Sequence, residues 1–151
     1  MGKIIEADKV GYLYQSKYQK TKALSEVSCS FEQGKVYAVT GKSGSGKSTF
    51  LSLLAGLDVP TEGKLYIDGK EILEIDRDAY RRNQASVIYQ AFHLFPLLTV
   101  LENVMFPMEL LGKMAHEENY AVIVVTHNAA VADAADVVYG MMDGRLEVVC
   151  G

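Results

Sequence analysis

Strand-sized apolar runs separated by turn-forming residues are the main pattern along this chain. Val36–Thr40 and Ala121–Val125 are rich in β-branched residues, and short runs of this kind are typical of buried strands. Asp143-Gly144 lies between two apolar runs and indicates a tight hairpin, as does Asp68-Gly69. The strands predicted from these patterns are Val27–Phe31, Val36–Thr40, Lys64–Ile67, Ala85–Gln90, Ala121–Val125, Asp136–Met142 and Leu146–Val149.

Helical spacing of apolar residues follows several of these runs. Ser48–Leu57 has the pattern of a helix, and Thr99 is a suitable N-cap for a second helix over Val100–Leu111. Arg77–Asn83 and Ala129–Ala135 predict shorter helical segments, whereas the opening residues alternate only loosely. Because strands alternate with helices, the 151 residues are predicted to form a single α/β domain with a mainly parallel sheet.

The composition is that of a globular protein, with 49% hydrophobic and 23% charged residues and a formal net charge of −4. Proteins that bind the nucleic-acid backbone are usually basic, so DNA or RNA is not expected as a partner. No apolar run approaches the roughly 18–20 residues of a membrane-spanning helix. The N-terminal residues MGKIIEADKV lack the apolar core of a signal peptide, and a cytoplasmic location is therefore expected.

The cysteines and two of the histidines carry no recognisable motif. Cys29 and Cys150 lie far apart and neither belongs to a CxxC pair, so we expect reduced thiols rather than a disulfide or a metal site. His93 and His116 are likewise expected to be surface residues.

The strongest chemical signal is GKSGSGKST, which links the predicted strand Val36–Thr40 to the predicted helix Ser48–Leu57. Glycines allow positive φ angles, so that successive N–H groups can point at an anion, and the start of a helix adds further N–H donors. Lys47 can reach the β- and γ-phosphates of a nucleotide, and the Ser48 hydroxyl suits Mg²⁺. The predicted nucleotide-binding residues of this loop are Gly41, Ser43, Gly44, Ser45, Gly46, Lys47, Ser48 and Thr49.

A phosphate loop is shared by ATPases, GTPases and small-molecule kinases, so further motifs must distinguish these classes. The N-K-x-D segment that reads guanine in GTP-binding proteins is absent from the sequence. A phosphate-loop kinase would need an arginine-rich lid and an acceptor site, and Arg81-Arg82 is too little for such a lid.

Further segments, in the right order over about residues 4–149, resemble the ATP-binding subunits of ABC transporters, closest to their lipoprotein-releasing and macrolide- or peptide-exporting branch. VIYQAFHLFPLLTVLENV is similar to the Q-loop, which implies that Gln90 contacts Mg²⁺ and signals to a membrane partner. VIVVTHN is similar to the H-loop, which implies that His127 contacts the γ-phosphate. Asn128 departs from the aspartate that the family commonly has there. The resemblance implies ATP and Mg²⁺ as cofactors, Lys47, Gln90 and His127 as catalytic residues, and Ser48 and Gln90 at the metal.

A tyrosine near the N-terminus is expected to stack on adenine. Tyr14 precedes Leu24 at the spacing that the family uses for this aromatic residue, and Tyr12 and Tyr18 are alternatives. Stacking of a base on an aromatic side chain contributes roughly 1–3 kcal/mol in proteins that bind single-stranded nucleic acid.

Three family elements are missing between the Q-loop and the H-loop: the LSGGQ signature, the Walker B strand with its Asp-Glu, and the D-loop. The sequence passes from one side of this gap to the other near Lys113–Met114, which indicates an internal deletion. Loss of a general base typically costs 10²–10⁴-fold in rate, so hydrolysis is expected to be impaired. The family's Walker B strand lies between the H-loop and Q-loop strands, so its loss is expected either to open a gap in the sheet or to force these two strands to pair directly. Marginal stability is predicted, because exposed strand edges favour aggregation.

The resemblance therefore implies a phosphate-loop NTPase sheet with an N-terminal antiparallel portion, lacking the helical signature subdomain. Its function would be that of an ATP-binding subunit that couples ATP to export through a membrane-spanning partner, at the inner face of the membrane. A second nucleotide-binding subunit is expected from the family but is doubtful without LSGGQ. The alternative function is a nucleotide-binding remnant that does not hydrolyse ATP.

Overall fold

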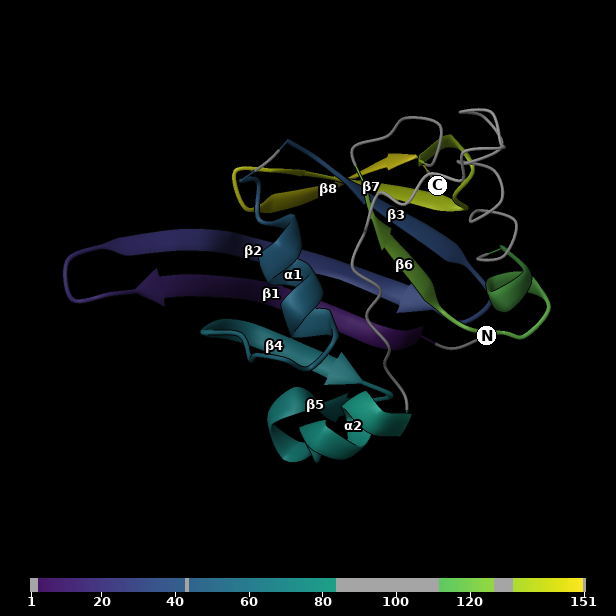
Figure 1. Cartoon of the computed structure of the whole chain (residues 1–151), viewed down its shortest axis with the longest axis horizontal. Helices are drawn as coiled ribbons and strands as arrows, with labels where there is room; N and C mark the ends of the chain where they lie inside the picture. The colour runs from purple at the N-terminus through teal and green to yellow at the C-terminus, as the bar shows by residue number, and fades with distance from the viewer. Residues whose placement is uncertain (1–2, 43, 84–111, 127–131, 151) are drawn as a thin grey trace, which may run out of the picture.

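The computed structural model describes residues 3–42, 44–83, 112–126 and 132–150, which form two β-sheets (Figure 1). The first sheet is antiparallel and has the strand order β2-β1-β4-β5. Its strands are β1 (Lys3–Gln15), β2 (Lys20–Glu32), β4 (Glu62–Ile67) and β5 (Lys70–Glu71). The antiparallel N-terminal portion implied by the family resemblance is thus present.

The second sheet has the order β6-β3-β7-β8 and is mostly parallel. The strand β3 (Val36–Thr40) is parallel to both β6 (Val122–Val125) and β7 (Val137–Met142). The last strand, β8 (Arg145–Cys150), returns antiparallel to β7 through the predicted turn at Asp143-Gly144. The predicted α/β class is therefore confirmed, and the predicted bounds of β3 agree with the structure.

The helix that follows the phosphate loop, α1 (Lys47–Leu54), ends earlier than predicted. Gly56 adopts a left-handed φ of 75°, its N–H bonds to the Leu53 carbonyl at 3.1 Å, and the Leu57 N–H bonds to the Ser52 carbonyl at 2.9 Å. This paired arrangement is a Schellman ending, which stops a helix at a glycine. The prediction of a helix through Leu57 was wrong because apolar spacing continues past the glycine that ends it.

Two short helical elements follow the antiparallel strands. The 3₁₀ turn η1 (Ile72–Glu74) leads into α2 (Arg77–Asn83), whose bounds are those predicted. Residues 112–116 are also helical. The predicted strand Ala85–Gln90 and helix Val100–Leu111 lie outside the described residues, as does much of the predicted helix Ala129–Ala135.

The N-terminal hairpin is longer than its sequence pattern predicts. β2 begins at Lys20 rather than at Val27, and it pairs with β1 from Lys3↔Glu32 to Gln15↔Lys20. Register shifts interrupt this pairing, and they break the two-residue alternation by which a strand is recognised. The prediction of a short strand was wrong for this reason.

The core lies where the two sheets and α1 meet (Figure 1). Phe31 of β2 packs edge-on against Tyr37 of β3 and Tyr139 of β7, with ring centroids 4.9 and 5.6 Å apart. Tyr37 and Tyr139 stack in parallel at 5.9 Å, and Phe50 of α1 lies 6.3 Å from Phe31. This aromatic cluster fixes α1, and with it the phosphate loop, against both sheets.

Candidate functional site

The loop between β3 and α1 has the backbone that its glycines predict. Gly44 and Gly46 have positive φ angles of 80° and 106°. Gly46 is the N-cap of α1, and neither a capping side chain nor an acidic residue occupies the first turn. The first N–H groups of a helix have no partner within the helix, so these donors and the helix dipole favour an anion at this position.

Gly46 and Gly44 face different surroundings. A Cβ at Gly46 would lie 2.7 Å from the main-chain oxygen of Ala23, so this side of the loop packs tightly on β2. A Cβ at Gly44 would meet no atom within 4 Å. The loop is therefore anchored on one side and open on the other, where a ligand can approach its backbone.

Ser45 is held at the centre of the loop by main-chain bonds. Its N–H bonds to the Lys42 carbonyl at 3.2 Å, and its carbonyl accepts the Gly144 N–H at 2.9 Å, from the turn between β7 and β8. Its side chain is buried, and its hydroxyl is without a hydrogen-bond partner within the part of the chain that the structure describes. The main-chain bonds of Ser45 therefore hold the loop against the turn between β7 and β8.

Lys47 turns back over the loop that precedes it. Its ammonium group donates hydrogen bonds to the carbonyl oxygens of Gly41 and, at 3.1 Å, of Lys42. Ser48 is exposed, and its carbonyl accepts the Ser52 hydroxyl at 3.0 Å. The positive charge of Lys47 and the Ser48 hydroxyl are therefore both at the start of α1.

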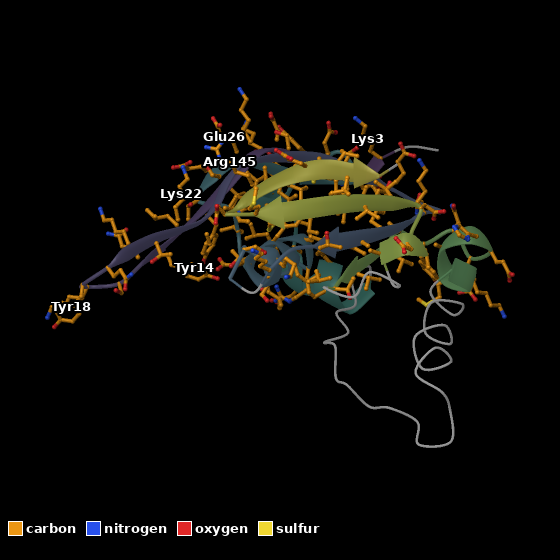
Figure 2. All side chains as sticks on the ribbon, turned by 90° about the horizontal axis from the view of Figure 1, so that it is seen from above. Lys3, Tyr14, Tyr18, Lys22, Glu26 and Arg145 are labelled. Carbon is orange, nitrogen blue, oxygen red and sulfur yellow. The ribbon has the colours of Figure 1, made fainter. Side chains whose placement is uncertain are left out.

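Of the three candidate tyrosines, Tyr14 is the one whose hydroxyl contacts a side chain of the phosphate-loop helix. Its hydroxyl lies 2.8 Å from Oγ1 of Thr49, and half of its side chain is exposed. Tyr12 also faces this region, but its hydroxyl donates a hydrogen bond to Asp58, which raises the pKa of Tyr12 to about 12. Tyr18 is 90% exposed at the far tip of the hairpin (Figure 2). The three candidate tyrosines are thus in three different environments.

The structure brings together Tyr14 and the predicted loop residues other than Ser43. Ser43, Gln90 and His127 lie outside the described residues, as does His93. The sequence analysis missed the contacts of Asp58 and Gly144 with this region. The sequence carries no signal for either contact, because each joins residues far apart along the chain.

Cys29 and His116, two side chains without a recognisable motif, both lie in the expected environment. Cys29 is a free thiol, as expected, and burial raises its pKa to about 12. His116 is exposed, as expected, but its Nε2 also lies 2.7 Å from Oδ2 of Asp136.

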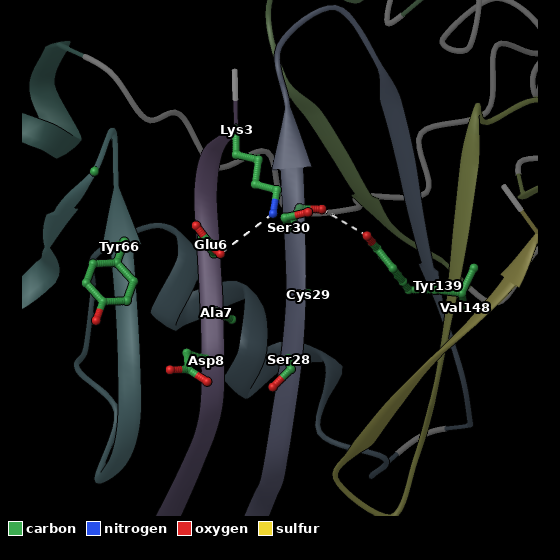
Figure 3. A pocket seen from close by; sticks show the side chains of 11 residues that line it. Lys3, Glu6, Ala7, Asp8, Ser28, Cys29, Ser30, Tyr66, Tyr139 and Val148 are labelled. Atoms are coloured by element: carbon green, nitrogen blue, oxygen red, sulfur yellow. Dashed lines mark hydrogen bonds and ion pairs between the residues drawn. The ribbon is translucent and has the colours of Figure 1, made fainter. Parts of the chain in front are cut away.

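A shallow groove of about 640 Å³ lies elsewhere, on the outer face of the antiparallel sheet (Figure 3). Lys3 and Glu6 form an ion pair at 3.7 Å along it, and the Tyr139 hydroxyl donates to the Ser30 carbonyl at 2.9 Å. Its walls are mainly the solvated side of strands whose other side forms the core. We therefore place the candidate site at the phosphate loop rather than in this groove.

The residues that the structure describes contain no cluster of three or more His, Cys, Asp or Glu side chains arranged to hold a metal ion. Within the same residues, no helix has the length and apolar character needed to cross a membrane.

Comparison with known proteins gives consistent results. The family model described as ABC transporter matches residues 24–147. The uncharacterized ABC transporter ATP-binding protein YclH of Bacillus subtilis is 40% identical over 119 residues, which cover 78% of this chain and 52% of YclH. The lipoprotein-releasing system ATP-binding protein LolD of Xylella fastidiosa is 39% identical over 115 residues, covering 74% of this chain and 48% of LolD.

A solved structure shares the fold. The dimeric structure of MJ0796, a bacterial ABC transporter cassette, superposes with a TM-score of 0.79 at 24% identity, covering 97% of this chain and 99% of that chain.

The methionine import ATP-binding protein MetN of Latilactobacillus sakei is 39% identical over 111 residues, or 72% of this chain and 32% of MetN. This chain spans about half the length, or less, of the curated relatives that it matches.

Proposed function

The chain belongs to the ABC transporter family, and from this membership we propose that it binds ATP at the phosphate loop as the nucleotide-binding part of a transporter. The observation that carries the proposal is the loop geometry. One loop combines left-handed glycines, the uncapped start of α1 and the Lys47 ammonium. Backbone N–H groups and a positive charge at a helix start favour the binding of phosphate.

Each loop group has a role in this proposal. Lys47 would exchange the carbonyl oxygens of Gly41 and Lys42 for phosphate oxygens, which carry full negative charge and form stronger hydrogen bonds. The N–H groups at the start of α1 would bind further phosphate oxygens. Thr49 and Ser43 complete the predicted set, and Tyr14 provides an exposed ring on which adenine can stack.

The start of α1 offers an oxygen ligand that suits Mg²⁺. The Ser48 hydroxyl is an exposed oxygen ligand beside Lys47, and oxygen ligands are those that Mg²⁺ prefers. We propose that Ser48 and Gln90 hold the ion, which would neutralise phosphate charge when bound. His127 is proposed to contact the γ-phosphate, on the family resemblance alone.

A membrane-spanning partner is proposed because the relatives are named as parts of transport systems. LolD is named for lipoprotein release and MetN for methionine import, so the names of relatives include both directions of transport. We propose export because the motifs resemble the lipoprotein-releasing branch. The proposed location is the inner face of the membrane, beside that partner. The family pairs two nucleotide-binding copies, but this chain lacks the LSGGQ segment that would complete the site of the second copy.

A second candidate function is ATP binding without turnover. The sequence lacks the Walker B Asp-Glu and the LSGGQ segment, which would respectively polarise water and complete the second subunit's site. We infer that hydrolysis is impaired for this reason. Binding alone would then depend on the loop residues that are present.

A binding titration with a fluorescent ATP analogue tests the proposal. Lys47→Ala is expected to weaken binding by roughly 10-fold or more, because hydrogen bonds to charged groups contribute about 1.5–3 kcal/mol. Lys42→Ala is the matched control, since Lys42 is an exposed lysine of the same loop whose carbonyl, not side chain, contacts Lys47. Equal affinity of the Lys47→Ala variant and the unmodified protein would remove the phosphate-loop assignment.

Phosphate release measured on the same samples separates the two candidate functions. We expect bound ATP without release above the background of Lys47→Ala. Turnover at a rate typical of enzymes, about 1 s⁻¹ or faster, would show that the missing segments are not required.

A further inference from the structure

We propose that Tyr12 and Asp58 are positioning residues that hold the Tyr14 ring in place for the base of a nucleotide. The inference rests on the proposed function, because it concerns the base-binding part of the same site. Spacing offered Tyr12 only as an alternative stacking residue, and neither the motifs nor the comparisons give Asp58 a role. The contacts form a chain from Asp58 through both tyrosines to Thr49.

Asp58 is fixed at both of its carboxylate oxygens. Its Oδ1 accepts the Val59 N–H at 2.8 Å, and its Oδ2 accepts the Tyr12 hydroxyl. A carboxylate bonded at both oxygens has little freedom to rotate, so it defines where the Tyr12 hydroxyl must lie. The raised pKa of Tyr12, about 12, is consistent with this bond, because the neutral hydroxyl is the form that donates to Asp58.

Tyr12 in turn contacts the ring of Tyr14. The ring centroids are 4.7 Å apart and the planes are inclined at 67°, an edge-to-face arrangement. The pairing of β1 with β2 shifts register on both sides of Tyr12, between Val10 and Tyr12 and between Tyr12 and Leu13. Tyr12 and Tyr14 are two residues apart in β1, so the alternation of the strand places both side chains on the same face of the sheet.

Tyr14 is held at its other end by the phosphate-loop helix. Its hydroxyl lies 2.8 Å from Oγ1 of the buried Thr49, while half of the Tyr14 side chain remains exposed. The ring is therefore restrained at its hydroxyl by Thr49 and at its side by Tyr12. The exposed remainder is the surface available to a planar base.

The two hydrogen bonds reach both ends of α1. Thr49 lies in the first turn of the helix, and Asp58 follows the turn that ends it. Strand β1 is thus attached to the first turn of the helix whose start would bind phosphate and to the segment that follows the end of this helix. The distance between base and phosphates is thereby set by protein contacts before a nucleotide binds, which lowers the ordering cost of binding.

The test compares ATP with inorganic tripolyphosphate, which has the phosphates but no base. Tyr12→Phe keeps the ring and removes only the hydroxyl, and it is expected to weaken ATP binding about 3- to 10-fold, the effect of one hydrogen bond. Tripolyphosphate affinity is expected to be unchanged. Tyr66→Phe, on the outer face of the antiparallel sheet, is the matched control and is expected to change neither affinity.

A second variant separates positioning from general damage to the fold. Asp58→Ala removes the acceptor, and the double variant Tyr12→Phe with Asp58→Ala is expected to be no weaker for ATP than Asp58→Ala alone, because both remove the same bond. An equal loss for ATP and tripolyphosphate, or no loss for ATP in Tyr12→Phe, would overturn the inference.

The same measurements show whether the proposed function has failed instead. Loss of tripolyphosphate binding in Lys47→Ala supports the phosphate loop independently of Tyr12. If Lys47→Ala binds both ligands normally, the proposed function fails and this inference fails with it. A third result is that Lys47→Ala binds neither ATP nor tripolyphosphate, while Tyr12→Phe has the same ratio of ATP affinity to tripolyphosphate affinity as the unmodified protein. In that case only this inference fails.

Discussion

Gly46 shows at the scale of one residue why the phosphate loop requires glycine. Its φ of 106° is unfavourable for residues with a Cβ, and the nearest main-chain atom to a Cβ there would be the Ala23 oxygen at 2.7 Å. The Ala23 oxygen belongs to the backbone of β2, which cannot move aside as a flexible side chain can. The position is therefore restricted both by conformation and by space.

Alanine substitutions at Gly46 and Gly44 should separate these two restrictions. Gly44→Ala meets only the conformational cost and is expected to lower the free energy of unfolding by about 1–2 kcal/mol. Gly46→Ala is expected to lower it further, because the clash with Ala23 is added. Urea unfolding monitored by circular dichroism measures both values. Equal destabilisation by the two variants would contradict the packing of this loop on β2.

Asp136, the residue before β7, connects β3 with the helical residues 112–116. Its Oδ2 accepts the Val36 N–H of β3 at 2.7 Å and also lies 2.7 Å from Nε2 of His116. His116 ends the helical residues 112–116, in which Ala115 is fully buried in a cluster with Val36 and Val122. One carboxylate and a small apolar cluster thus attach this helical segment to β3 and β6.

The pKa of Asp136 lies below its ordinary value because of these contacts. Desolvation acts to raise it, but the Val36 N–H and the neighbouring His116 and Lys35 charges together outweigh desolvation. A carboxyl group whose pKa is lowered by folding stabilises the folded state above its unfolded pKa, near 4. That stabilisation is lost as the pH falls through the lower folded value, so it should disappear in moderately acidic solution.

Asp136→Ala is expected to lower the free energy of unfolding at pH 7 by about 1–3 kcal/mol, because it leaves the buried Val36 N–H without an acceptor. Asp136→Asn keeps an oxygen at this position and should be destabilised less. Urea unfolding at pH 7 and pH 3 measures these values. The difference between the unmodified protein and Asp136→Asn is expected to shrink at pH 3, and a constant difference would show that the carboxylate charge is irrelevant.

At the scale of the whole molecule, the parallel sheet is the part in which the missing segment matters. Within the described ranges, β6 pairs with β3 and with no other strand. In the family the Walker B strand is expected on its other side, while the predicted Q-loop strand Ala85–Gln90 lies outside the described residues. We therefore predict that this edge of β6 can pair with another molecule, because strand edges without a neighbour favour association.

Sedimentation velocity over a dilution series should therefore show concentration-dependent self-association of the purified protein. A chimera that receives the intervening segment of the Bacillus subtilis relative between Lys113 and Met114 is the matched comparison. We expect the chimera to unfold at a higher temperature and to associate less, because β6 regains a neighbour. A stable monomer of the unmodified chain at all concentrations would disprove this prediction.

The sequence by itself determined the family, the α/β class, β3 and the phosphate loop. These features depend on neighbouring residues: glycines set the loop backbone, apolar runs define strands, and Lys47 follows Gly46 directly. The same local reading misplaced the start of β2 and the end of α1, because register shifts and one left-handed glycine override apolar spacing.

Only the tertiary structure decided which distant residues support the site. Spacing singled out Tyr14 but left Tyr12 and Tyr18 open, whereas the fold gave each tyrosine a different environment. The contacts of Asp58 with Tyr12, and of Gly144 with Ser45, join residues far apart in the chain. No local pattern encodes such pairs, because they arise from how the two sheets and α1 pack together.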